Sequence, residues 1–70
     1  MSSILLEMGY KEIKPNLFMK EIGYVTLYHD FRKGFRWSYA YKGSEKIEVH
    51  KLKEYHKVKA LERVKNDKKV

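Results

Sequence analysis

The chain has 70 residues, of which 43% are hydrophobic and 14% aromatic, and it carries a formal net charge of +7. This length allows one domain with a thin core, and the composition is that of a folded chain. The lack of cysteine excludes disulfides and thiolate metal sites. No run approaches the roughly 20 apolar residues that cross a bilayer, and residues 4–6 are too short a run for a signal peptide. We therefore expect a cytoplasmic protein.

The N-terminal segment predicts a short helix over residues 2–8. Ser2 suits the N-cap position, and Gly9 suits the left-handed position just past a helix end. Residues 10–16 contain the only proline and are typical of an extended link or turn.

Residues 17–50 predict an antiparallel meander of three to four strands. The strand-like runs are residues 17–21, 24–30, 35–42 and 46–50, and each break between them contains a glycine. Residues 52–66 then lack glycine and proline, and their apolar residues share one half of a helical wheel. We expect one α+β domain over residues 1–70, in which this C-terminal helix packs on one sheet face and residues 67–70 form a frayed tail.

The turns predict which side chains share a face, because residues alternate between faces along a strand. A four-residue loop at 31–34 would place Asp30 opposite Phe35, and a two-residue turn at Gly43-Ser44 would place Lys42 opposite Glu45. A five-residue first loop would instead shift the pairing by one residue and mix the two faces.

The four-residue loop gives one aliphatic and one aromatic face. The aliphatic face carries Val25, Leu27, Ala40, Ile47 and Val49, with Ser38; the aromatic face carries Tyr24, Tyr28, Trp37, Tyr39 and Tyr41. The last predicted strand adds Lys46, Glu48 and His50 to the aromatic face. Such polar residues do not fit a fully buried layer, so we expect the aromatic face to be partly open.

Three interpretations of the aromatic face remain at this point. Its rings could stack on nucleic-acid bases while the basic residues around them hold phosphates. The N-terminal helix could instead fold over the tyrosines through Ile4, Leu5 and Met8 and make them part of the core. The face could also bind a protein, because Tyr, Trp and Arg are enriched at interface hot spots.

The distribution of charge favours a polyanionic partner. Residues 1–30 hold three cations against four acids, whereas residues 31–70 hold thirteen cations against five acids. The alternative is that the lysines only keep a small domain soluble. If nucleic acid is the partner, the predicted binding residues are Arg32, Lys33, Arg36, Trp37, Tyr39, Lys42 and Lys46. The tip Arg32-Lys33-Gly34 would grip phosphate, although such a tip can also be a solvated turn.

The sequence offers no pattern for catalysis or for a metal or cofactor. His29, His50 and His56 lack the spacing of metal ligands, the four glycines form no phosphate-binding loop, and no serine has an evident base. We therefore do not expect an enzyme.

In outline, the sheet and following helix of residues 17–66 resemble the sheet-based DNA-binding modules of phage integrase arm domains and plant AP2 domains. The resemblance lies in topology and carries over no motif residue, but it implies a sheet face exposed to DNA. The size and lysine content also resemble those of short proteins of phages and mobile elements. We expect a non-enzymatic nucleic-acid-binding accessory protein; the alternative is a protein-interaction module that binds a host factor or forms a homodimer through the aromatic face. Binding to nucleic acid would weaken steeply with salt.

Overall fold

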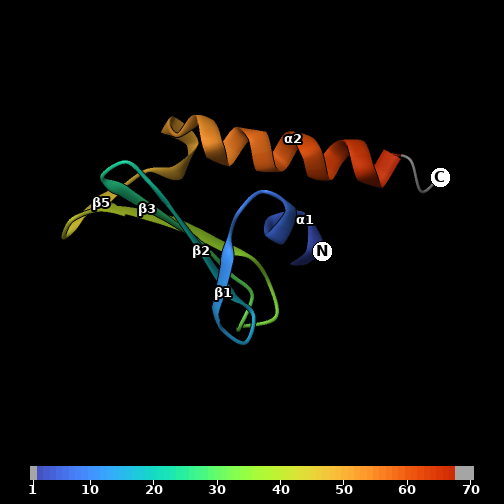
Figure 1. Cartoon of the computed structure of the whole chain (residues 1–70), viewed down its shortest axis with the longest axis horizontal. Coiled ribbons are helices and arrows are strands. Elements are labelled where there is room, and N and C mark those ends of the chain that lie inside the picture. Colours follow the sequence, from blue (N-terminus) through green and yellow to red (C-terminus); the bar gives the residue numbers. More distant parts are fainter. Residues whose placement is uncertain (1, 68–70) are drawn as a thin grey trace.

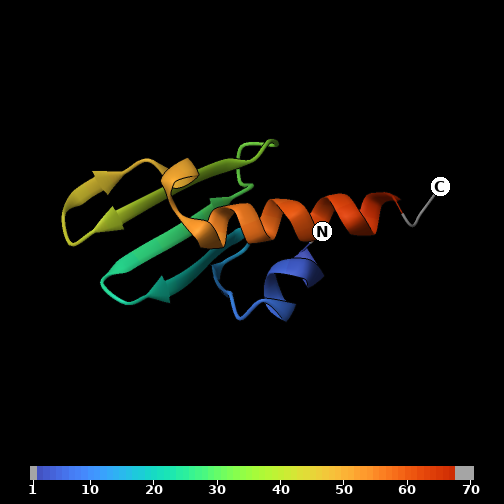
Figure 2. The ribbon, with the colours of Figure 1, turned by 90° about the horizontal axis from the view of Figure 1, so that it is seen from above.

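Two helices cover one side of a five-stranded antiparallel sheet in a computed structural model of the chain, which describes residues 2–67 (Figure 1). The elements are α1 (Ser2–Glu7), β1 (Lys11–Lys14), β2 (Leu17–Ile22), β3 (Val25–Asp30), β4 (Trp37–Lys42), β5 (Glu45–Ile47), the 3₁₀ turn η1 (Val49–Lys51) and α2 (Lys53–Asp67). The strands lie side by side in chain order; α2 begins over the sheet and extends past its edge, and α1 lies beside the middle of α2 (Figure 2). The expected α+β class, meander and C-terminal helix are confirmed; residues 68–70 of the predicted tail lie outside the described residues.

The sheet gains a strand, β1, where the sequence predicted a link or turn. Lys11 pairs with Met19 and Lys14 pairs with Leu17 across an irregular register. The reversal between the strands uses Pro15 and Asn16, and Asn16 adopts a left-handed backbone with φ of 67°. All four β1 residues are exposed, so the strand has no burial alternation that its sequence could reveal.

The predicted pairing of β3 with β4 is wrong by two residues. Asp30 lies opposite Trp37 rather than Phe35, and Tyr28 lies opposite Tyr39, so the connecting loop spans residues 31–36. A shift of two residues leaves every side chain on its predicted face, because the period of a strand is two.

The two-residue turn at Gly43-Ser44 is confirmed. Lys42 pairs with Glu45 and Tyr41 with Lys46. The strand β5 ends at Ile47, earlier than predicted, and His50 lies in η1. The predicted contribution of Glu48 and His50 to the aromatic side of the sheet is therefore wrong.

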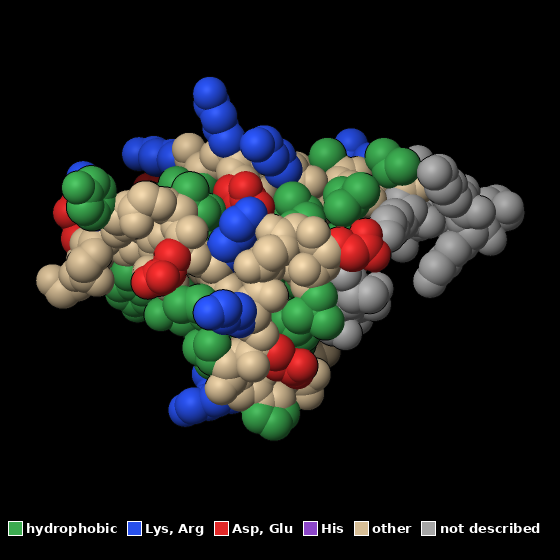
Figure 3. All heavy atoms as spheres, viewed as in Figure 1, with side chains coloured by type: hydrophobic (Ala, Val, Ile, Leu, Met, Phe, Trp, Pro, Cys, Tyr) green, Lys and Arg blue, Asp and Glu red, His purple; other side chains and the backbone are tan. Residues whose placement is uncertain are grey.

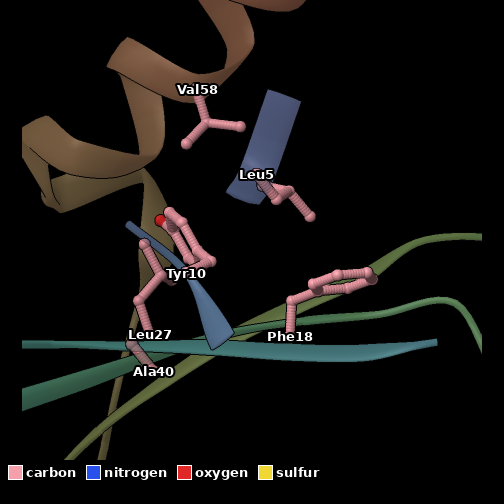
Figure 4. Close-up of a cluster of buried hydrophobic side chains, with 6 residues drawn as sticks. All are labelled: Leu5, Tyr10, Phe18, Leu27, Ala40 and Val58. Carbon is pink, nitrogen blue, oxygen red and sulfur yellow. The ribbon is translucent and has the colours of Figure 1, made fainter. Parts of the chain in front are cut away.

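The core lies between the sheet and both helices (Figure 4). Its fully buried side chains come from every layer, namely Leu5, Tyr10, Phe18, Leu27, Ala40 and Val58. Because Leu5 of α1 joins the same cluster as Val58 of α2, both helices cover the aliphatic face. The interpretation in which the N-terminal helix covers the tyrosines is wrong.

A hydrogen-bonded lysine joins the two helices to the sheet. The Nζ atom of Lys20, on β2, donates to the carbonyl of Met8 at 2.7 Å and to Oε2 of Glu54 at 3.0 Å. The charge of Lys20 is thereby paired on the helix side of the sheet, and the end of α1 is fixed relative to α2.

Candidate nucleic-acid interface

The side of the sheet opposite the helices carries a row of aromatic rings. Trp37, Tyr39 and Tyr41 alternate along β4, and Tyr28 stands beside Tyr39 on β3. From here on, these four residues are called the aromatic face. The expectation that Tyr24 belongs to it is wrong, because Tyr24 lies in the turn between β2 and β3. Trp37 is 50% exposed and Tyr28 and Tyr39 are partly exposed, so no element within residues 2–67 covers the face.

The rings of the aromatic face hold one another in place. Tyr28 and Tyr39 are stacked, with centroids 5.0 Å apart and planes inclined by 21°. Tyr41 meets both of them edge-on, at 6.5 Å and 6.2 Å. The ring of Phe35, in the loop before β4, lies 5.7 Å from that of Trp37 and extends the aromatic surface. Offset and edge-on pairs are the favoured aromatic geometries, so the surface is preorganised.

A buried carboxylate anchors one end of this surface. Asp30 is 8% exposed, and its carboxylate accepts hydrogen bonds from the Tyr39 hydroxyl at 3.2 Å and from Nε and Nη2 of Arg32 at 3.0 Å and 2.8 Å. The side-chain and backbone hydrogen bonds from Arg32 lower the pKa of Asp30. Burial, followed by the interaction with Asp30, raises the pKa of Tyr39. The guanidinium of Arg32 is therefore fixed beside the aromatic face, with its side chain still 45% exposed.

Two further predicted cations lie on or near this side of the sheet. Lys46 is exposed and stands directly opposite Tyr41. Lys33 is exposed in the loop that contains Arg32, and it forms no ion pair with any residue of the described chain.

The remaining two predicted cations lie elsewhere. Arg36 turns toward α2, where Nη1 donates to Oε1 of Glu62 at 2.7 Å, Nη2 donates to Oε2, and the guanidinium stacks over Phe31. Lys42 pairs with Val25 and shares the face of Ala40 by alternation, so it lies on the helix side of the sheet. The structure thus brings together Trp37, Tyr39, Lys46 and Arg32, with Lys33 in the adjoining loop.

Three residues at this surface were missing from the predicted binding set. Tyr28 and Tyr41 were expected on the aromatic face. The available signal was the alternation of faces, because Tyr28 is two residues from Thr26 on β3 and Tyr41 is two residues from Tyr39 on β4. Lys11 lies on the same side because it pairs with Met19, which in turn pairs with Tyr28. Its position could not be found from the sequence, since β1 itself was not recognised.

The buried histidine, His29, lies on the helix side and belongs to the core. Its Nδ1 atom is 3.0 Å from the hydroxyl of Ser38, and the centroid of its ring is 5.2 Å from that of Tyr10 and 6.3 Å from that of Tyr55. Burial lowers the pKa of His29 to about 4, so the imidazole is neutral at neutral pH. Its Nε2 atom and the Tyr10 hydroxyl are buried without a hydrogen-bond partner among the residues described.

Comparisons with known proteins add no identity to this geometry. No family model matches the chain, and neither the curated proteins nor the solved structures that were compared with it gave a match. Residues 2–67 contain no group of His, Cys, Asp or Glu side chains that could hold a metal ion. Neither α1 nor α2 is long and apolar enough, over the residues described, to cross a membrane.

Proposed function

We propose that the protein is a non-enzymatic nucleic-acid-binding accessory protein that uses the aromatic face. The observation that carries this proposal is a row of preorganised, solvent-facing rings with cations at its edges, on the side of the sheet that both helices leave open. Stacking of one base on an aromatic ring contributes about 1–3 kcal/mol, and cations beside the rings hold the phosphates.

The spacing of the rings favours unpaired bases as the ligand. Alternate residues on a strand are about 6.6 Å apart, which leaves room for a base at each ring of β4. A duplex presents only base edges to a protein, so its bases could not reach the flat faces of Trp37, Tyr39 and Tyr41. We therefore expect a preference for single-stranded DNA or RNA.

The rings of β4 and the cations beside them have separate roles in this proposal. Trp37, Tyr39 and Tyr41 would stack on bases, while Lys46 and Arg32 would contact phosphates at opposite ends of the row. Lys33 would extend the phosphate contact into the loop. Arg36 is left out because it turns toward α2, where it pairs with Glu62 and its side chain is only 19% exposed, against 45% for Arg32 in its pair with Asp30. Lys42 is left out because it lies on the far face.

A second candidate function, a protein-interaction module or homodimer through the same face, is favoured by one observation. Phe35 and Trp37 are both at least half exposed and in contact with each other. Contiguous exposed aromatic residues mark protein interfaces as well as nucleic-acid platforms.

Salt dependence separates the two functions. The fluorescence anisotropy of a labelled single-stranded oligonucleotide would be measured against protein concentration over a series of salt concentrations. The proposal expects saturable binding. The logarithm of the association constant should fall linearly with the logarithm of the salt concentration. The absence of binding at low salt would reject it, and concentration-dependent dimerisation in the same buffer would favour the protein interface.

A further inference from the structure

The outer side of α2 carries a second concentration of positive charge. Its exposed cations, which we call the cationic ridge, are Lys53, Lys57, Lys59 and Arg63. Two pairs among them are four residues apart and are therefore neighbours on the helix surface. Lys and Arg side chains stand along the upper edge of the molecule, which α2 forms (Figure 3).

The acidic residues of the same stretch are turned inward and neutralised. The Glu54 side chain is 12% exposed and pairs with Lys20 at 3.0 Å, and the Glu62 side chain is 16% exposed and pairs with Arg36. Burial alone would raise the pKa of Glu62, but the hydrogen bonds and charge of Arg36 outweigh it and lower that pKa. From Lys53 to Val64, the outer surface of α2 therefore carries cations with no exposed carboxylate among them.

The cationic ridge and the aromatic face lie on opposite sides of the molecule. Val58 packs α2 onto Leu27 and Ala40, which are on the helix side of the sheet. The aromatic rings alternate with those residues and point the other way. A ligand on one surface therefore leaves the other surface open.

We infer that the cationic ridge is a second nucleic-acid contact, which takes the phosphate backbone of a duplex. Lysine binds phosphate as a point charge, and contacts to the backbone are independent of sequence. No exposed residue of α2 from Lys53 to Val64 is Trp, Tyr or Phe, so the large rings that form a stacking platform are missing from this stretch of the ridge. Ala60 and His56 lie between its two rows of cations, and the Nε2 atom of His56 is 2.6 Å from the carbonyl oxygen of His50.

The composition of the ridge argues against the other possible occupants. Lysine is depleted from the centres of protein–protein interfaces. Helices that lie on membranes insert a face of Trp, Phe or Leu, whereas the apolar side chains of the ridge are Ala60 and Val64. The apolar face of α2, with Val58, is already packed in the core.

With both surfaces in use, one molecule would hold a single strand and a duplex together. The ridge is argued from its own charges, and only this simultaneous holding rests on the proposed function of the aromatic face. The two surfaces also have separate reporters. Trp37 lies on the aromatic face and is the only tryptophan of the chain, so its emission does not report on α2.

The experiment uses a labelled duplex of about 20 base pairs, roughly two helical turns. Its binding is followed by anisotropy over a salt series for the wild type, the ridge variant Lys53→Gln/Lys57→Gln, and the control Lys14→Gln/Lys42→Gln, which loses the same charge from exposed positions outside α2. Each lost phosphate contact removes about 0.9 from the slope of log K against log salt. We expect the slope to become shallower by about 2 in the ridge variant, which loses two contacts, and to stay unchanged in the control. The emission of Trp37 should stay constant throughout.

Equal slopes for the ridge variant and the control would overturn the inference, because only net charge would then matter. A change in Trp37 emission on adding duplex would also overturn it, since the duplex would then occupy the aromatic face. Failure of the single-stranded oligonucleotide to bind, with the duplex result as expected, would reject the proposed function and leave the ridge intact. Far-ultraviolet circular dichroism of each variant checks that the fold is retained.

Discussion

Tyr28 and Tyr39 are paired directly across β3 and β4, and their rings stack 5.0 Å apart on the side of the sheet opposite α1 and α2. Both helices pack on Leu27 and Ala40 of the opposite face. The stacked pair is further fixed by the hydrogen bond from Tyr39 to Asp30. The open aromatic face is therefore a rigid feature of the fold, and its use can be tested residue by residue.

Replacing Trp37 should weaken nucleic-acid binding with little effect on stability. The ring is half exposed, so Trp37→Ala removes a stacking surface and only part of a buried contact. Loss of one base–ring stack costs about 1–3 kcal/mol, which is about a 5- to 150-fold loss in affinity for a single-stranded oligonucleotide. Anisotropy titrations measure the affinity, and urea unfolding measures the stability.

The matched control for Trp37→Ala is Tyr24→Ala. Tyr24 is 89% exposed but lies in the turn between β2 and β3, outside the aromatic face. We expect its affinity to match that of the wild type. Equal losses of affinity in the two variants would mean that exposed aromatic residues contribute only through non-specific contacts.

The two faces of one hairpin should respond differently to loss of a lysine. Lys46 stands opposite Tyr41 on the aromatic side, whereas Lys42 lies on the helix side. For a single strand, Lys46→Gln should reduce the slope of log K against log salt by about 0.7, and Lys42→Gln should leave it unchanged. The reverse order of effects would contradict the assignment of the two faces.

The stability of the protein should fall in mild acid because of His29. Its pKa is about 4 in the folded chain, mainly through burial with a contribution from Arg36, against about 6.5 when unfolded. The pKa of His29 is lower in the folded state than in the unfolded state. The stability that the neutral imidazole contributes is therefore complete above about pH 6.5 and is lost as the pH falls toward 4. At about 1.4 kcal/mol per pKa unit, the loss is on the order of 3 kcal/mol.

Urea midpoints between pH 8 and pH 4 measure this dependence. The variant His29→Phe keeps a ring in the core but cannot take up a proton, so its midpoint should change much less between pH 6.5 and pH 4.5. His50→Gln replaces an exposed histidine of η1 and should retain the wild-type dependence. If a steep loss of stability in acid remains in His29→Phe, other titrating groups cause it.

Arg36 should prove to be a structural residue. Arg36→Met leaves the inward-facing carboxylate of Glu62 without its partner, which should reduce the free energy of unfolding by about 1–3 kcal/mol. The double variant Arg36→Met/Glu62→Met should lose less than the sum of the single variants, because no unpaired charge remains. Arg63→Met replaces the exposed arginine that follows Glu62 on α2, and it should change the free energy of unfolding by less than about 0.5 kcal/mol. Additive losses in the double variant would contradict the pairing.

The parts of the fold that could be predicted from the sequence are those set by local turns. Gly43 has φ of 64° in the two-residue turn, and this turn alone set the pairing of Lys42 with Glu45. The open aromatic face could also be predicted, because alternation along β4 survives an error of two residues in the register.

The parts that could not be predicted depend on distant contacts. Phe35 and Arg36 alternate like strand residues, but Arg36 leaves the strand direction to pair with Glu62, which is 26 residues away. The loop is also held from within, because the backbone N–H of Arg32 and its side chain both donate to Asp30. No local pattern in the sequence reports the contact of Arg36 with Glu62, whereas the contact of Asp30 with Arg32 is a local one of the Asx-turn type. The predicted loop, which used neither contact, was two residues too short.

The most direct test of the central claim is the emission of Trp37 during titration with an unlabelled single-stranded oligonucleotide. If bases stack on the aromatic face, the emission should change saturably, the change should reverse when salt is added, and Trp37 should report the same dissociation constant as anisotropy. If anisotropy shows binding while the emission of Trp37 stays constant, the strand is held elsewhere on the cationic surface, and the aromatic face is not the nucleic-acid site.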